Sequence, residues 1–255
     1  MNLVPWNAYE VVETLTTSIF LLEVTMSGIL SFDSSELLHQ SDVASLSLEG
    51  QLAEIFKRTR LALDEHGLTM RNIFFIIAEV CDMKDRPILN EAQKAIWEPQ
   101  AYPARIIHQR QDFKGGARIR LLFSASKTPH VCVNSQEGQI PTGPFSRAAI
   151  VGRRVYGSGV RPINPKTQTL ISDDLREQAV QCLKNLDTNM RASGTSIQRA
   201  YAFTTYLTDM RNAQVALEVF EQFGFLPDHV QMSFELVQAL NEGHPIEIAC
   251  NALLP

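Results

Sequence analysis

The most constraining feature of this sequence is a pattern that occurs twice, 127 residues apart. An apolar stripe at helical spacing begins at Leu48 and again at Leu175, and the two stripes end at Gly67 and Gly194. Spacings of three and four residues are typical of an amphipathic helix lying on another layer, and a terminal glycine supplies its left-handed cap. A chain that repeats such an element at a fixed interval is expected to fold as two units of one kind.

The same order of predicted elements surrounds both helices. A strand rich in aromatic and β-branched residues follows each helix, and then comes a second, shorter helix. A hairpin with Gly152 at its turn precedes the long helix of the second copy. The elements are predicted over residues 72–80 and 88–98 in the first copy, and over 146–151, 153–156, 200–207, 213–223, 230–237 and 246–253 in the second.

The predicted fold class is α+β: two tandem β-β-α-β-α-β-β domains, each a mixed sheet with two helices on one face. The bare face of each sheet needs cover from its sibling or from other chains. We predict domains over 1–125 and 140–255, joined by a linker over 126–139 of loop composition. The Ser-rich segment 34–47 is expected to be a loop that is mobile or covers a site.

Composition narrows the class of function. The net charge of −5 argues against nucleic acid as a partner, because phosphate binding requires clustered Lys and Arg. No apolar stretch is long enough to cross a bilayer, and the N-terminus does not resemble a secretory signal. The four cysteines form no CxxC pair and are interpreted as reduced thiols. We expect a cytoplasmic protein with no membrane partner. No cofactor or metal is expected, because there is no glycine-rich phosphate loop and no metal-ligand cluster.

Three motifs in the second copy resemble the Rid family, the YjgF-type reactive intermediate deaminases. They are Gly143-Pro-Phe-Ser146, the Ser-Gly-x-x-Pro-x-Asn-Pro-x-Thr loop of residues 158–167, and Tyr-Leu-Thr-Asp-Met at 206–210. The resemblance implies a chorismate-mutase-like domain that assembles as a trimer, with sites between neighbouring units. It also implies hydrolysis of reactive enamines or imines to keto acids and ammonia.

The resemblance further implies a set of site residues. An Arg in a Pro-Ala-Arg motif binds the substrate carboxylate, and a Ser-Gly pair, an Asn, a Tyr and a Glu surround it. A guanidinium suits this role because its planar fork matches a carboxylate. The first copy retains Arg105 and Asn90, and its Ser27-Gly28 is aligned with the Ser-Gly pair; Arg120 stands in place of the Glu.

The second copy departs from the pattern. It keeps Ser158-Gly159, but Phe145 replaces the Tyr, Leu217 the Asn, Ala249 the Glu and His229 the Arg. The losses in the two copies are complementary, so we hypothesise one site that combines both, with Arg105 and Asn90 facing the second copy. The predicted catalytic residues are Ser27, Asn90, Arg105 and Arg120. The predicted substrate-binding residues are Gly28, Arg105, Phe145, Ser158, Gly159 and His229.

Several of these residues have structural alternatives. Ser158-Gly159 could be kept for a backbone turn, and His229 could be a packing residue. Arg118 and Arg120 alternate with Ile119, so they share one strand face, which is either solvated or a site for a substrate with more than one carboxylate.

The favoured function is deamination of a small carboxylate-bearing metabolite. The alternatives are a biosynthetic isomerase, cyclase or chorismatase-like hydrolase on the same fold, and a non-catalytic binding or structural protein. The acidic charge and the lack of a basic aromatic stripe argue against a ribonuclease. A homo-oligomer is expected, with a homotrimer favoured.

Overall fold

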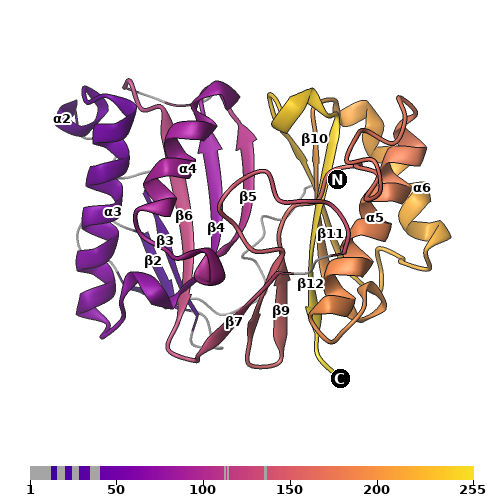
Figure 1. Ribbon diagram of the computed structural model, residues 1–255, viewed down its shortest axis with the longest axis horizontal. Helices are drawn as coiled ribbons and strands as arrows, with labels where there is room; N and C mark the ends of the chain where they lie inside the picture. The colour runs from indigo at the N-terminus through magenta and orange to yellow at the C-terminus, as the bar shows by residue number, and fades with distance from the viewer. Residues whose placement is uncertain are drawn as a thin grey trace.

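The computed structural model describes residues 13–15, 21–24, 29–34, 41–111, 113, 115–134 and 137–255 of the chain, with the backbone alone described at 13–15, 21–24 and 41. In this part of the chain two six-stranded sheets form the centre, and two long helices, two shorter ones and one helix of four residues lie outside them (Figure 1). The predicted fold, two mixed-sheet units each with two helices, is therefore confirmed.

The first half of the chain forms one sheet with strand order β1-β2-β3-β6-β4-β5. Strands β4 and β5 run parallel, and the other neighbouring pairs are antiparallel. The elements are β1 (Glu13–Leu15), β2 (Leu21–Val24), β3 (Ile29–Asp33), α2 (Ser41–Ala44), α3 (Leu48–Glu65), β4 (Ile73–Val80), α4 (Arg86–Lys94), β5 (Ala104–Gln109) and β6 (Ile119–Ser126).

The second half repeats this topology strand for strand, in the order β11-β10-β12-β9-β8-β7. Here β10 and β11 are the parallel pair. The elements are β7 (His130–Val133), β8 (Ala148–Val151), β9 (Arg154–Gly157), α5 (Leu175–Ala192), β10 (Ala200–Leu207), α6 (Ala213–Gln222), β11 (Gln231–Leu236) and β12 (Ile246–Leu253).

Each long helix begins and ends where the sequence predicts. Ser47 accepts a hydrogen bond from the backbone N–H of Gly50 at the start of α3, and Asp174 caps α5 in the same way through Glu177. These caps satisfy N–H groups that have no partner within the helix. Gly67 and Gly194 follow the helices with φ of +68° and +81°, a region that favours glycine.

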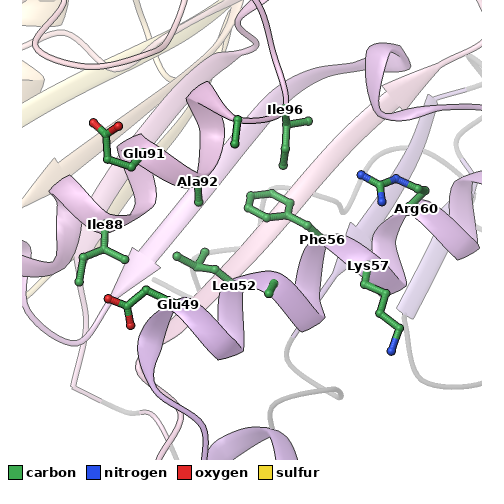
Figure 2. Close-up of a pocket in the computed structure, with 11 residues that line it drawn as sticks. Glu49, Leu52, Phe56, Lys57, Arg60, Ile88, Glu91, Ala92 and Ile96 are labelled. Atoms are coloured by element: carbon green, nitrogen blue, oxygen red, sulfur yellow. The ribbon is translucent and has the colours of Figure 1, made fainter.

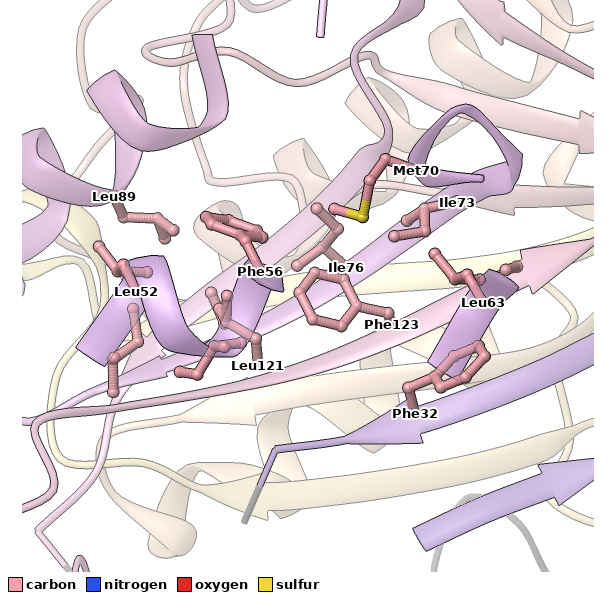
Figure 3. Packing of buried hydrophobic residues seen from close by; sticks show 14 of the residues in the cluster. Phe32, Leu52, Phe56, Leu63, Met70, Ile73, Ile76, Leu89, Leu121 and Phe123 are labelled. Carbon is pink, nitrogen blue, oxygen red and sulfur yellow. The ribbon is translucent and has the colours of Figure 1, made fainter. Parts of the chain in front are cut away.

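The apolar face of α3 packs on the first sheet. Figure 3 shows Phe56 of α3 among Ile76 of β4 and Phe123 of β6, and the rings of Phe56 and Phe123 are 6.0 Å apart. Burying a side chain of this size contributes about 2 kcal/mol. An equivalent core lies between the second sheet and helices α5 and α6.

The other faces of the two sheets pack against each other, which gives four layers with helices on both outer surfaces (Figure 1). The ring of Phe74 in β4 lies 4.8 Å from the ring of Tyr156 in β9. At the edge of the first sheet, β5 bonds to the second half at both ends, where Ala104 pairs with Ser146 and Gln109 with Ala239. The predicted bare face of each sheet is thus covered by its sibling.

Two details of the prediction are wrong. Each half has three strands before its long helix, not two, so the unit is β-β-β-α-β-α-β-β. The additional strand of the second half, β7, falls within the predicted linker 126–139 and pairs with β8. Its polar flanks resemble a loop, but main-chain bonds to a neighbouring strand define it. The predicted loop 34–47 contains the short helix α2, and its residues 35–40 lie outside the described residues.

Candidate functional site

Arg105 is the centre of a buried polar cluster between the two halves. It lies in β5 and is only 3% exposed. Its Nη1 donates to Asn90 Oδ1 at 2.9 Å and to Gln93 Oε1, and its guanidinium stacks 4.9 Å from the centre of the Phe145 ring. Nη2 is buried without a hydrogen-bond partner. An unpaired buried donor of a cation is costly, so this atom is poised for an anionic ligand.

The backbone of Arg105 bonds to the second half. Its N–H donates to Ser158 Oγ at 2.8 Å, and its carbonyl accepts from the N–H of Gly159 at 3.2 Å. Ser158 Oγ in turn donates to the carbonyl of Ser146 at 2.5 Å. The Ser-Gly pair therefore holds the edge of β5 in register with the second half, which fixes the position of the guanidinium.

Two glycines make room for the cluster. A Cβ atom at Gly143 would lie 2.7 Å from Arg105 Nη2 and 3.0 Å from Asn90 Oδ1. A Cβ atom at Gly159 would lie 1.9 Å from Glu247 Oε1. A side chain at either position would displace the guanidinium or the carboxyl group, so the two glycines allow Gly143 to lie against Arg105 and Gly159 to lie against Glu247.

Glu247 of β12 is the carboxyl group of this site. It is 4% exposed, and burial raises its pKa from 4.5 to about 7, although the charges of Arg161 and Arg105 oppose the shift. Burial in turn lowers the pKa of Arg105 to about 9, with Arg86 adding to the effect and Glu247 opposing it. A carboxyl with a pKa near 7 suits general acid–base chemistry at neutral pH.

Sequence reasoning overlooked Glu247 because it aligned Ala249 with the family's Glu. The sheet register corrects this. Arg120 pairs with Glu79 in the first sheet, and Glu247 pairs with Tyr206 in the second. Since Glu79 and Tyr206 are themselves 127 residues apart, Glu247 is the counterpart of Arg120. The interval of the two long helices, applied to the last strands, would have identified it.

The register also changes two other alignments. Arg105 pairs with Ile76, and the corresponding pair in the second sheet is Met232 with Phe203, so Met232 and not His229 replaces the Arg. His229 is exposed in the turn before β11 and does not stand at the position of Arg105, so its binding of substrate stays a prediction.

Ser27 and Gly28 lie outside the described residues. The pairing of β3 with β6 and of β9 with β12 matches Leu30 to Val155. By this register, the residues three and four positions after Leu30 match those three and four positions after Val155. The counterparts of Ser158 and Gly159 are therefore Asp33 and Ser34.

Arg120 does not belong to the Arg105 cluster. It forms ion pairs with Asp33 and with Glu79. The Glu79 carboxylate is also contacted by His108 Nε2 and Arg110 Nη1, each 3.3 Å from Oε1. Arg118 forms a two-pronged ion pair with Asp85, at 2.7 and 2.8 Å. Both arginines of this strand therefore have carboxylate partners within the protein, and a site for a multiply charged substrate on this strand face stays a prediction.

Of the predicted residues, the structure thus brings together Asn90, Arg105, Phe145, Ser158 and Gly159. The hypothesis that one cluster combines both halves agrees with this geometry. Sequence reasoning missed Gln93, Gly143 and Glu247. Gln93 could have been found from its position three residues after Asn90, on the same helical face.

A separate groove of about 550 Å³ lies between α3 and α4, on the outside of the molecule (Figure 2). Its floor is apolar, with Leu52, Phe56 and Ala92, while Glu49 and Glu91 lie near one end. At the corresponding place in the second half, Arg176 and Glu218 form an ion pair between the helices. None of the residues that line the groove belongs to the Arg105 cluster.

Within the described residues, no group of three or more His, Cys, Asp or Glu is arranged to hold a metal ion. None of the helices described there has the length and apolar character needed to span a bilayer.

Comparison with known proteins identifies the family. The family description "Endoribonuclease L-PSP" matches residues 137–254. RutC family protein y4sK of Sinorhizobium fredii is 36% identical over 118 residues, which cover 46% of this chain and 91% of that protein. The chain belongs to the Rid family. Two further Rid proteins are 2-iminobutanoate/2-iminopropanoate deaminase of Homo sapiens and Reactive Intermediate Deaminase A of Arabidopsis thaliana chloroplasts. The human protein is 30% identical, and the match covers 53% of this chain and 90% of the human protein. The plant protein is 28% identical, and the match covers 52% of this chain and 71% of the plant protein.

Among solved structures, RidA of the Antarctic bacterium Psychrobacter sp. is 27% identical and has a TM-score of 0.45, covering 48% of this Rid chain and 98% of its own.

Proposed function

We propose that the chain hydrolyses a small imine or enamine that carries a carboxylate, releasing a keto acid and ammonia. The observation that carries the proposal is the buried Arg105 guanidinium, whose partners are neutral amide oxygens and whose Nη2 has no partner. A buried cation without a carboxylate partner favours an anionic ligand. The names of the human and plant relatives, an imine deaminase and a reactive intermediate deaminase, add support.

In this proposal each group has one task. Arg105 and Asn90 bind and orient the substrate carboxylate. Glu247, protonated near neutral pH, donates its proton to the imine nitrogen and accepts one from the attacking water. Water adds to the imine carbon and gives a carbinolamine. Its hydroxyl proton then passes to the amino nitrogen, the C–N bond breaks as the C=O bond forms, and ammonia leaves with the keto acid as the second product. The ring of Phe145 packs against the Arg105 guanidinium and restricts the orientation of that group.

The test measures keto-acid release from an imino acid generated in situ by an amino-acid oxidase, above the spontaneous rate. Arg105→Ala is expected to lower kcat/KM about 100-fold or more, because it removes the carboxylate anchor. Glu247→Gln is expected to lower kcat about 100-fold, a usual contribution of acid–base catalysis. Met232→Ala, at the counterpart of Arg105 in the other half, is the matched control and is expected to change little. An Arg105→Ala variant with the kcat/KM of the wild type would contradict the proposal.

A non-catalytic carboxylate-binding protein is the second candidate. One observation favours it: Phe145 has no hydroxyl at the position where the resemblance implies a Tyr. In this case the wild type would bind 2-oxo acids but release no keto acid from an imine, and Arg105→Ala would abolish the binding.

A further inference from the structure

Arg86 is a second cation on the same face of α4 as the site residues. It is the first residue of the helix, Asn90 follows one turn later, and Gln93 lies a further turn along. Side chains at these spacings share one helical face. Since Asn90 and Gln93 both bind the Arg105 guanidinium, this face of the helix is directed at the site.

The partners of Arg86 are neutral. Its Nη1 donates to the carbonyl and to Oγ1 of Thr142, at 3.1 and 3.0 Å. Within the described part of the chain, neither Arg86 nor Arg105 forms an ion pair. The nearby carboxylate of Glu242 is bound to Arg161 at 2.7 Å. Burial lowers the pKa of Arg86; the charge of Arg161 adds to this shift, and the charge of Glu242 opposes it.

Arg86 and Arg105 reach the same short segment. Arg86 binds Thr142, and the next residue, Gly143, lies against Arg105 Nη2 and Asn90. The same Thr142 Oγ1 also accepts a hydrogen bond from Asn241 at 3.4 Å. The two guanidinium groups therefore flank one turn of the second half.

The local charge balance leaves room for more than one negative group. Three arginines, Arg86, Arg105 and Arg161, interact electrostatically around Glu247 and Glu242. Glu242 balances one of them, while Glu247 retains its proton up to about pH 7. One substrate carboxylate would balance Arg105 and still leave one cation without a counter-charge.

The second half provides an internal control on this interpretation. The positions 127 residues after Arg86, Asn90, Gln93 and Arg105 are all apolar: Ala213, Leu217, Phe220 and Met232. The helices α4 and α6 begin at matching positions, so the fold does not itself require an Arg at the start of this helix. Arg86 is lost together with the anchor residues, as expected of a member of the site.

We propose that Arg86 binds a second acidic group of the substrate, so that the preferred substrates are 2-imino acids with a distal carboxylate. This inference rests on the proposed function for the reaction, and on Arg86 and Thr142 for the substrate class. An imine formed by oxidation of an acidic amino acid has the required chemistry, and its hydrolysis gives a 2-oxo dicarboxylate and ammonia.

The experiment compares two substrates of equal chain length. Oxidases generate 2-iminopentanedioate from glutamate and 2-iminopentanoate from norvaline, and kcat/KM is measured for both. The wild type is expected to prefer the dicarboxylate by about tenfold or more, since a site built for a charged group rejects an analogue that lacks it. Arg86→Met is expected to lower this ratio at least about tenfold. Arg211→Met removes an exposed arginine in the short 3-10 turn that precedes α6 and should leave the ratio unchanged.

Direct binding of the stable products separates the two proposals. Dissociation constants are measured for 2-oxopentanedioate and 2-oxopentanoate by calorimetry. Tighter binding of the dicarboxylate that depends on Arg86, without turnover of either imine, would support the substrate class and overturn the proposed reaction. Two results would overturn the proposed substrate class and leave the proposed reaction standing. One is turnover of both imines at equal kcat/KM. The other is an Arg86→Met variant whose ratio of kcat/KM for the two imines is within twofold of the wild-type ratio.

Discussion

Glu247 holds a proton that an exposed glutamate would lose, because its carboxyl is buried against Gly159 with only partial compensation from Arg161 and Arg105. This ties stability to pH. A folded-state pKa raised from 4.5 to about 7 means that the folded protein binds more protons than the unfolded chain in this window. The stabilising contribution is complete below about pH 4.5 and is lost as the pH rises through 7.

The Glu247→Gln variant tests this at the residue scale. Its amide does not titrate, so its free energy of unfolding relative to wild type should rise by about 3 kcal/mol between pH 4 and pH 8. Urea denaturation at several pH values measures the difference. The exposed Glu98→Gln variant is the control and should show no such trend. A constant difference across the range would show that Glu247 ionises normally.

At the scale of elements, a buried glutamine joins α3 to its surroundings. The Nε2 of Gln51 donates to the carbonyls of Ala44, Leu46 and Gly116, and its Oε1 accepts from the N–H of Arg118. The counterpart in α5, Gln178, makes one such bond, to Ser172, and its Oε1 has no partner. The first helix thus depends on this side chain more than the second does.

Gln51→Leu should therefore be more damaging than Gln178→Leu. It leaves several main-chain groups without partners, and we expect it to cost about 2–4 kcal/mol of unfolding free energy, against about 1 kcal/mol or less for Gln178→Leu. Chemical denaturation of the two variants provides the comparison. Equal costs would contradict the interpretation that Gln51 joins α3 to α2 and to the segment just before β6.

The elements were largely predictable because helix periodicity, caps and strand composition are local signals; β10 and β12 span the predicted residues. The features that could not be predicted are those defined by contacts between elements. Strand β7 is defined by its pairing with β8, and the equivalence of Glu247 with Arg120 is defined by sheet register. The cluster at Arg105 was predictable in its motif residues, whereas the role of Gly143 depends on how the halves meet.

At the scale of the whole molecule, the two sheets share a core to which both halves contribute. Phe74 is fully buried there, against Tyr156 of the other sheet, whereas Phe203 lies in the second half's own core with Phe220 and Phe225. Each Phe→Ala variant is expected to lose about 3–5 kcal/mol of unfolding free energy. Only Phe74→Ala should also weaken 2-oxo acid binding under native conditions, because it loosens the contact between the halves. Calorimetric titration of both variants checks this, and equal affinities would refute it. Assembly into a homo-oligomer stays a prediction.

The hydrogen bonds between the backbone of Arg105 and the Ser158-Gly159 pair join the two halves of one polypeptide. A cleft built from separate chains comes apart when the protein is diluted below the affinity of its subunits. Here the covalent connection keeps the partners at a high effective concentration, whatever the amount of protein. Expression level and dilution therefore change how many clusters exist, but not whether each one is complete.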